Sequence, residues 1–178
     1  MSDDTNLHQP TREPDKCTEA AGQLSPLAGD EHGEGVIRFY NAKDESTGFL
    51  SNYYFHDLIW NGQEYKSSEH AYQSIKFTGS PAIREQVVSC HLPADAFHLS
   101  RKHADDIDAD WGERKLDVME QVLRAKFADP RLKARLMETG TCYLVEASTS
   151  GDCFWGICTK SGMGENRLGK ILMKIRDA

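Results

Sequence analysis

Residues 67–77 have the sequence Ser67-Ser68-Glu69-His70-Ala71-Tyr72-Gln73-Ser74-Ile75-Lys76-Phe77. Serine is a favoured N-cap residue, so this stretch predicts a helix that begins after Ser67 and ends near Phe77. Glu69, Gln73 and Lys76 are spaced at i, i+4 and i+7, which places their side chains on one face of that helix. A charged, hydrogen-bonding face is poor core material. It predicts instead one wall of a small-molecule site.

The segments before this helix have strand patterns. Residues 36–40 alternate in hydrophobicity and predict a strand. Residues 57–60 and 63–66 flank Asn61-Gly62, a dipeptide typical of two-residue hairpin turns. The sequence therefore predicts a β-hairpin directly before the polar helix.

Helical patterns dominate the rest of the chain. Helix start signals predict helices over about 81–90, 93–103, 110–127 and 129–139, and the period of the apolar residues after 166 predicts a last one. Residues 141–147 and 154–158 predict two more strands. Together these elements predict an α+β fold: a single domain with a small, mostly antiparallel sheet surrounded by several helices.

The composition is that of a globular protein, with 39% hydrophobic and 28% charged residues in a chain of 178. No apolar run approaches the length of a membrane span, and the acidic N-terminus has no secretory signal, so we expect a cytoplasmic protein without membrane partners. Residues 1–34 hold eight acidic and two basic residues, so this segment carries −6 of the total net charge of −7. Because this segment also lacks aromatic residues, it predicts a disordered acidic leader, and residues 35–178 predict the folded domain.

The near-neutral remainder has no basic stripe, so strong non-specific binding of nucleic acid is not expected. The seven histidines form no metal-ligand pair, and the cysteines have no zinc spacing. We therefore expect neither a metal nor a cofactor. A small anionic ligand is still compatible with this charge, because a few local arginines and lysines suffice to bind it.

Two candidate groups lie on the polar helix itself. Glu69 is either an acid that the helix dipole stabilises or a catalytic carboxylate, and spacing alone does not separate these roles. Lys76 is either solvated or a partly desolvated amine that attacks an aldehyde-like carbon.

Further candidates lie on the following helices. Arg101 and Lys102 are adjacent cations, a pattern that fits phosphate binding and also an ordinary surface. Trp111 is either a core anchor or an indole that stacks on a nucleobase.

Asp152 follows the strand predicted over 141–147 and precedes Trp155-Gly156. It either closes a turn with its side chain or presents a functional carboxylate at a strand end. The glycine-rich residues 162–169 enter the last helix, where backbone amides can receive an anion.

Taken together and in order, these segments resemble the NADAR family, which includes the YbiA-like proteins. The resemblance covers about residues 36–177 and rests on Phe49-Leu50-Ser51-Asn52, Ser67-Ser68-Glu69-His70 with Gln73 and Lys76-Phe77, Asp110-Trp111 with Lys115, Lys126-Phe127, Leu144-Val145-Glu146-Ala147-Ser148, Asp152 with Trp155-Gly156, and Gly164-Glu165-Asn166-Arg167-Leu168-Gly169.

The resemblance implies a YbiA-like fold and an N-glycosidase, a hydrolase that breaks the bond between ribose C1 and a nitrogen. Some family members act on phosphoribosyl-amino-pyrimidine intermediates of riboflavin synthesis, and others remove ADP-ribose from guanine in nucleic acid. A non-catalytic module that binds ADP-ribose or another nucleotide is the remaining alternative. The residues implied in catalysis map to Glu69, Lys76, Trp111, Asp152 and Trp155. We expect substrate contacts from Asn52, Gln73, Arg101, Lys102, Gly156 and Asn166.

Two departures from the family pattern are visible. Ala71 and Tyr72 follow His70, where many members have an aromatic residue directly after the histidine. Ile107-Asp108-Ala109 stands where many members have a cation shortly before the Asp-Trp pair, so an anion replaces a possible phosphate-binding cation at this point.

Overall fold

The computed structural model describes residues 35–178, so the acidic leader predicted over 1–34 lies outside the described residues. The strands are β1 (Val36–Phe39), β2 (Leu58–Trp60), β3 (Gln63–Tyr65), β4 (Tyr143–Ser148) and β5 (Ile157–Cys158). The α-helices are α1 (Ser68–Ser74), α2 (Pro81–Val88), α3 (Pro93–Lys102), α4 (Trp111–Lys126), α5 (Pro130–Glu138) and α6 (Arg167–Arg176). Short 3-10 helices are η1 (Gly48–Leu50), η2 (Ile75–Phe77) and η3 (Ala104–Asp106). This is the predicted α+β domain, with helices around small sheets.

The helix starts follow from local chemistry. Ser67 is the N-cap of α1, and its hydroxyl accepts a hydrogen bond from the His70 N–H. Proline occupies the first position of α2, α3 and α5, where its missing N–H costs nothing. The Asp129 carboxylate caps α5 by accepting from two backbone N–H groups.

The strand directions differ from the expectation of a mostly antiparallel sheet. The three-stranded sheet has the order β1-β4-β5, and both of its pairings are parallel. Among the strands of residues 35–178, only β2 and β3 pair as an antiparallel hairpin, around Asn61 and Gly62, which both have the positive φ of a tight hairpin turn. A long crossover through five helices separates β1 from β4, and such a connection permits parallel pairing.

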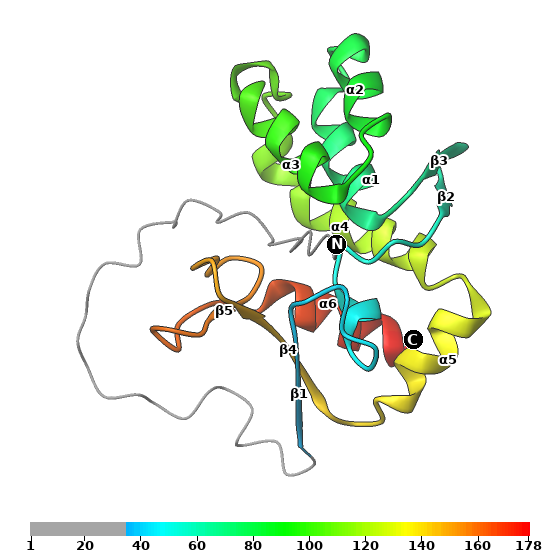
Figure 1. The fold of residues 1–178 in the computed structure, drawn as a ribbon, viewed down its shortest axis with the longest axis vertical. Coiled ribbons are helices and arrows are strands. Elements are labelled where there is room, and N and C mark those ends of the chain that lie inside the picture. Colours follow the sequence, from blue (N-terminus) through cyan, green and yellow to red (C-terminus); the bar gives the residue numbers. More distant parts are fainter. Residues whose placement is uncertain (1–34) are drawn as a thin grey trace, which may run out of the picture.

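Helix α4 joins two halves of the domain (Figure 1). Helices α1, α2 and α3 gather in one half, and β1, β4 and β5 lie with α6 in the other. Helix α4 contacts both α1 and α6. No helix within residues 35–178 is long and apolar enough to cross a membrane.

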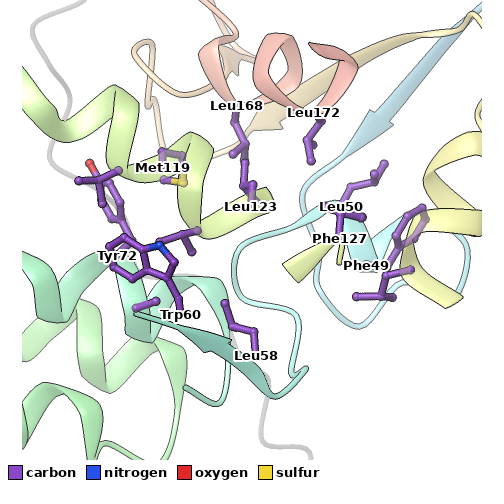
Figure 2. Packing of buried hydrophobic residues seen from close by; sticks show 14 of the residues in the cluster. Phe49, Leu50, Leu58, Trp60, Tyr72, Met119, Leu123, Phe127, Leu168 and Leu172 are labelled. Atoms are coloured by element: carbon purple, nitrogen blue, oxygen red, sulfur yellow. The ribbon is translucent and has the colours of Figure 1, made fainter. Parts of the chain in front are cut away.

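The hydrophobic core lies where these halves meet (Figure 2). Leu168 and Leu172 of α6 extend toward Leu123 of α4, and all three are at most 1% exposed. Phe49 of η1 packs edge-on against Phe127, with 6.3 Å between the ring centroids. Burial of these side chains fixes α4 as the central helix, and its first two turns contribute Trp111 and Lys115 to the site described below.

Candidate active site

One pocket of about 270 Å³ collects most of the predicted functional residues. It is lined by Tyr72, Gln73, Lys76, Phe97, Arg101, Trp111, Lys115, Asp152, Phe154 and Trp155. Three of these ten residues are cationic and one is acidic. The pocket thus has a positive lining in a chain whose net charge is −7.

Asp152 presents the carboxylate of the pocket. Its Oδ1 accepts hydrogen bonds from the backbone N–H groups of Phe154 (2.9 Å) and Trp155 (3.0 Å). Its own N–H donates to the Ser148 hydroxyl at the end of β4 (2.9 Å). The side chain is only 5% exposed. The carboxylate therefore closes the turn, as one reading of the sequence predicted, and is held rigidly at the pocket by the same contacts.

Aromatic rings form the walls of the pocket. Tyr72 packs edge-on against Trp111 and Trp155, with centroid distances of 5.0 and 5.6 Å. Trp155 is 7% exposed and belongs to the core, whereas Trp111 is only partly buried. The two indoles thus reach the pocket from α4 and from the turn after β4, and Tyr72 connects them.

Lys76 lies between these walls. Its Nζ is 5.4 Å from the Tyr72 ring centroid and 5.6 Å from that of Trp111. Cation–π contacts of this kind help to orient the ammonium group. The Lys76 carbonyl also accepts from the Asp108 N–H (2.8 Å), which ties the end of η2 to the approach to α4.

Glu69 lies one turn behind the pocket lining. It is fully buried, and its Oε1 accepts a 2.7 Å hydrogen bond from Gln73 Nε2. Its Oε2 has no hydrogen-bond partner among the described residues. Since Gln73 lines the pocket and Glu69 does not, the carboxylate reaches the pocket through the amide of Gln73.

Asn52 is outside the pocket lining and lies beside the N-terminus of α1, the helix that carries Glu69 and Gln73. Its carbonyl accepts from the Glu69 N–H (3.1 Å), and its Nδ2 contacts Met119 Sδ (3.3 Å). The adjacent Ser51 carbonyl accepts a 2.8 Å hydrogen bond from the Nζ of Lys126, and the Lys126 side chain is fully buried. Burial lowers the pKa of Lys126 to about 7. The loop that carries Asn52 is thereby fastened to the last turn of α4.

His70 faces away from the pocket and has a structural role. Its Nδ1 is 2.8 Å from the Ser67 hydroxyl, and its Nε2 is 3.2 Å from the Cys90 carbonyl. A neutral ring that donates from Nε2 satisfies both contacts. Burial lowers its pKa to about 4, which agrees with this neutral form. The ring joins the start of α1 to the connection between α2 and α3.

The other predicted substrate contacts are placed differently. Arg101 lines the pocket from the end of α3, whereas its neighbour Lys102 is exposed and outside the lining. Asn166 donates to the Leu144 carbonyl (2.8 Å) and accepts from the Glu146 N–H (3.0 Å), so it braces β4 against α6. Gly156 is also outside the lining; a Cβ there would lie 2.4 Å from the Glu146 carbonyl oxygen, so only glycine allows this approach to β4.

Four lining residues were not predicted: Tyr72, Phe97, Lys115 and Phe154. Tyr72 stands three residues after Glu69 and four before Lys76, so the helical period was the signal that could have placed it beside them. Lys115 is one turn after Trp111, at i+4, and this spacing was the signal available for it.

Asp108 stands where a family cation was expected. Its contacts are structural. Its carboxylate accepts from the Thr78 and Gly79 N–H groups (3.0 Å each) and pairs with Arg114. It therefore links the end of η2 to α4 and positions both Lys76 and Trp111. Among residues 35–178, no three His, Cys, Asp or Glu side chains are grouped so that they could hold a metal ion.

A buried carboxylate, a lysine and two indoles in one positively lined pocket of an α+β domain define a candidate small-molecule site. The NADAR domain model matches residues 38–178. The chain is 34% identical to the N-glycosidase YbiA of Escherichia coli, over 80% of this chain and 87% of that protein. It also resembles the solved structure of E. coli YbiA, with a TM-score of 0.72 and 32% identity over 80% of this chain and 83% of that one.

A riboflavin biosynthesis protein of Vibrio vulnificus is 38% identical over 81% of this chain, which spans only 38% of the length of that relative. The N-glycosidase Npun_R5314 of Nostoc punctiforme is 33% identical over 80% of this chain and 91% of its own length.

The chain belongs to the NADAR family, as the sequence motifs predicted. This membership confirms the expected fold and the expected enzyme class, a hydrolase acting on N-glycosyl compounds.

Proposed function

We propose that this protein hydrolyses the ribose C1–N bond of a phosphoribosyl-amino-pyrimidine, an intermediate of riboflavin synthesis. The observation that carries the proposal is the pocket itself, in which Asp152 and Lys76 face a space walled by Trp111 and Trp155. The name of the Vibrio vulnificus relative, a riboflavin biosynthesis protein, supports this choice of substrate.

The reaction adds water across the C1–N bond. As that bond breaks, its electron pair leaves with the nitrogen and positive charge develops on the ribose. A carboxylate beside C1 stabilises this charge, and a second group moves the proton of the attacking water to the departing nitrogen. The products are the free amino-pyrimidine and ribose 5-phosphate, so atoms and charge balance without a further reactant.

Asp152 is the residue we assign to charge stabilisation. Two backbone N–H groups fix one of its oxygens, and a group that is already oriented needs no reorganisation when charge develops. Glu69 is assigned to proton transfer through the amide of Gln73, or to the orientation of that amide toward the substrate. Trp111 and Trp155 hold the base between them and exclude water.

A second route uses the amine of Lys76. Its Nζ attacks C1 of the ring-opened sugar, the amino-pyrimidine leaves, and water then releases the sugar from the resulting Schiff base. Borohydride reduction during turnover traps this intermediate. Covalent labelling that disappears in Lys76→Ala supports the lysine route, and a fully active enzyme that never becomes labelled excludes it.

The size of the pocket favours a small metabolite. Its volume of about 270 Å³ lies just below the range of roughly 300–1,000 Å³ that is typical of small-molecule sites. ADP-ribose linked to guanine carries an additional adenosine and phosphate, which would extend out of this space. Release of ADP-ribose from guanine is therefore the alternative activity, and nucleotide binding without turnover is the alternative class.

Parallel incubations with phosphoribosyl-amino-pyrimidine and with ADP-ribosylated guanosine separate the three functions. Release of ribose 5-phosphate from the first substrate and of nothing from the second is the expected result. Release of ADP-ribose alone would show that ADP-ribosylated guanine is the substrate instead. Tight binding of either compound without release would identify a binding module.

A further inference from the structure

Lys115 and Arg167 converge on a single aromatic ring at the pocket. The Nζ of Lys115, in the second turn of α4, is 3.9 Å from the Phe154 ring centroid. The Cζ of Arg167, the first residue of α6, is 4.4 Å from the same centroid. Both Lys115 and Phe154 line the pocket. Two cations therefore meet at the ring that directly follows the Asp152 turn.

The two cations differ in how their charge is compensated. The Arg167 guanidinium pairs with Glu165, at 2.6 Å from Nε and 2.5 Å from the second nitrogen. Lys115 makes no ion pair or hydrogen bond with a side chain in the described part of the protein, and it is half-buried. An ammonium group held against an aromatic face, next to a second cation, is a favourable place for an anion.

The remaining cations of the lining have other positions. Lys76 contacts the rings of Tyr72 and Trp111 deep between the walls, where the reacting carbon is expected. Arg101 lies 5.9 Å from the Phe97 ring at the end of α3. Lys115 is therefore the cation of the lining whose aromatic contact, Phe154, belongs to the same turn as Asp152. A ribose placed with C1 at Asp152 carries its 5′-phosphate only a few bonds away.

We infer, resting on the proposed function, that Lys115 on the Phe154 ring is the phosphate-binding group of the site and makes the enzyme select the 5′-phosphorylated substrate over the corresponding nucleoside. Arg167, whose charge is compensated by Glu165, makes the second cation–π contact with the ring and helps to hold it in place. Phosphate recognition then lies on α4, and not on the adjacent pair Arg101 and Lys102 near the end of α3 where the sequence suggested it.

Lys115→Gln tests this role, because it removes the charge and keeps most of the side-chain length. We expect the KM for phosphoribosyl-amino-pyrimidine to rise about 10–100-fold, as for the loss of one charge-assisted contact, while kcat changes little. The kcat/KM for the dephosphorylated nucleoside should stay within about twofold of wild type. The preference of the enzyme for the phosphorylated substrate over the nucleoside should therefore be largely lost. Lys115→Arg should restore most of the preference. Lys133→Gln, an exposed lysine on α5, is the matched control and should keep it entirely.

Direct binding of ribose 5-phosphate by calorimetry separates this inference from the proposed function. If wild type binds ribose 5-phosphate and Lys115→Gln binds it at least about tenfold more weakly, the subsite stands even when no C1–N bond is hydrolysed. If Lys115→Gln binds ribose 5-phosphate like wild type, or loses activity equally on phosphate and nucleoside, the assignment is overturned while the activity stands. Circular dichroism and the thermal midpoint confirm that each variant is folded.

Discussion

Gln73 Nε2 donates a 2.7 Å hydrogen bond to Oε1 of Glu69, its neighbour one turn earlier on α1. Only Gln73 of this pair lines the pocket, and Glu69 is fully buried behind it. In the proposed reaction, the Glu69 carboxylate therefore acts through the amide of Gln73, and we expect the two side chains to form one functional unit.

A double-mutant cycle tests this coupling. Glu69→Ala and Gln73→Ala should each lower kcat about 100-fold, the lower end of what a positioned proton-transfer group contributes. Since both variants interrupt the same unit, the double variant should be about as active as the worse single one. Independent, multiplicative losses in the double variant would show that Glu69 and Gln73 act separately.

The burial of Glu69 has a consequence for stability. Its Oε2 is buried without a hydrogen-bond partner among residues 35–178, and a buried polar atom without a partner is costly. Glu69→Gln should therefore leave the thermal midpoint unchanged or raise it, while activity falls. A fall of the midpoint by more than a few degrees would mean that the carboxylate stabilises the fold.

The two indoles of the pocket should respond differently to truncation. Trp155 is 7% exposed and packed in the core, so Trp155→Ala should cost about 3–5 kcal/mol of unfolding free energy as well as activity. Trp111 is only partly buried, so Trp111→Ala should lower kcat/KM at a smaller cost in stability. Urea unfolding beside steady-state kinetics gives both numbers. Equal stability losses in the two variants would contradict the assignment of Trp111 to the substrate wall.

Lys126 should make stability depend on pH in the alkaline range. Burial lowers its pKa to about 7, below the value of about 10.4 for the unfolded chain. Between these values the unfolded state binds the proton more tightly, so the free energy of unfolding should rise with pH from about 7 to 10, by about 4 kcal/mol at most. Below pH 7 the cost of the buried charge is fully present. Lys126→Met should flatten this rise, and Lys133→Met, at an exposed site, should keep it. A wild-type profile as flat as that of Lys126→Met would disprove the shift.

His70 predicts sensitivity to acid. Its pKa is lowered to about 4 by burial, so the folded state resists protonation that the unfolded chain accepts near pH 6.5. The stability associated with the neutral ring should be intact above pH 6.5 and should be lost as the pH falls toward 4. Urea midpoints at pH 7, 5.5 and 4.5 should therefore fall more steeply in wild type than in His70→Asn. Parallel profiles would show that the ring does not titrate in this window.

The predictable parts of the fold are those that local chemistry determines. Asn61-Gly62 adopts positive φ at both residues and makes the hairpin that the dipeptide predicts. The parallel pairing of Val36 with Tyr143 was missed, because a contact between such distant segments leaves no local signal. The strand expected from Phe154 begins only at Ile157, since the Asp152 carboxylate accepts the N–H groups of Phe154 and Trp155 and thereby removes them from strand pairing.

The site was predictable in its chemistry and less so in its geometry. Asp152, Lys76, Trp111 and Trp155 meet in one pocket, as the ordered motifs implied. Asn166 was expected at the substrate, but both ends of its amide bind the backbone of β4. A buried lysine such as Lys126 is also invisible to sequence patterns, because lysine near a helix end is ordinarily solvated.

The most direct test of the central claim is the rate at which Asp152→Asn releases ribose 5-phosphate from phosphoribosyl-amino-pyrimidine in a single turnover. The asparagine carbonyl can still accept from the N–H groups of Phe154 and Trp155, so the turn should persist and the thermal midpoint should change little. Removing the charge that stabilises the developing cation should slow release about 1,000-fold relative to wild type. A folded Asp152→Asn enzyme that releases ribose 5-phosphate at the wild-type rate would contradict the account.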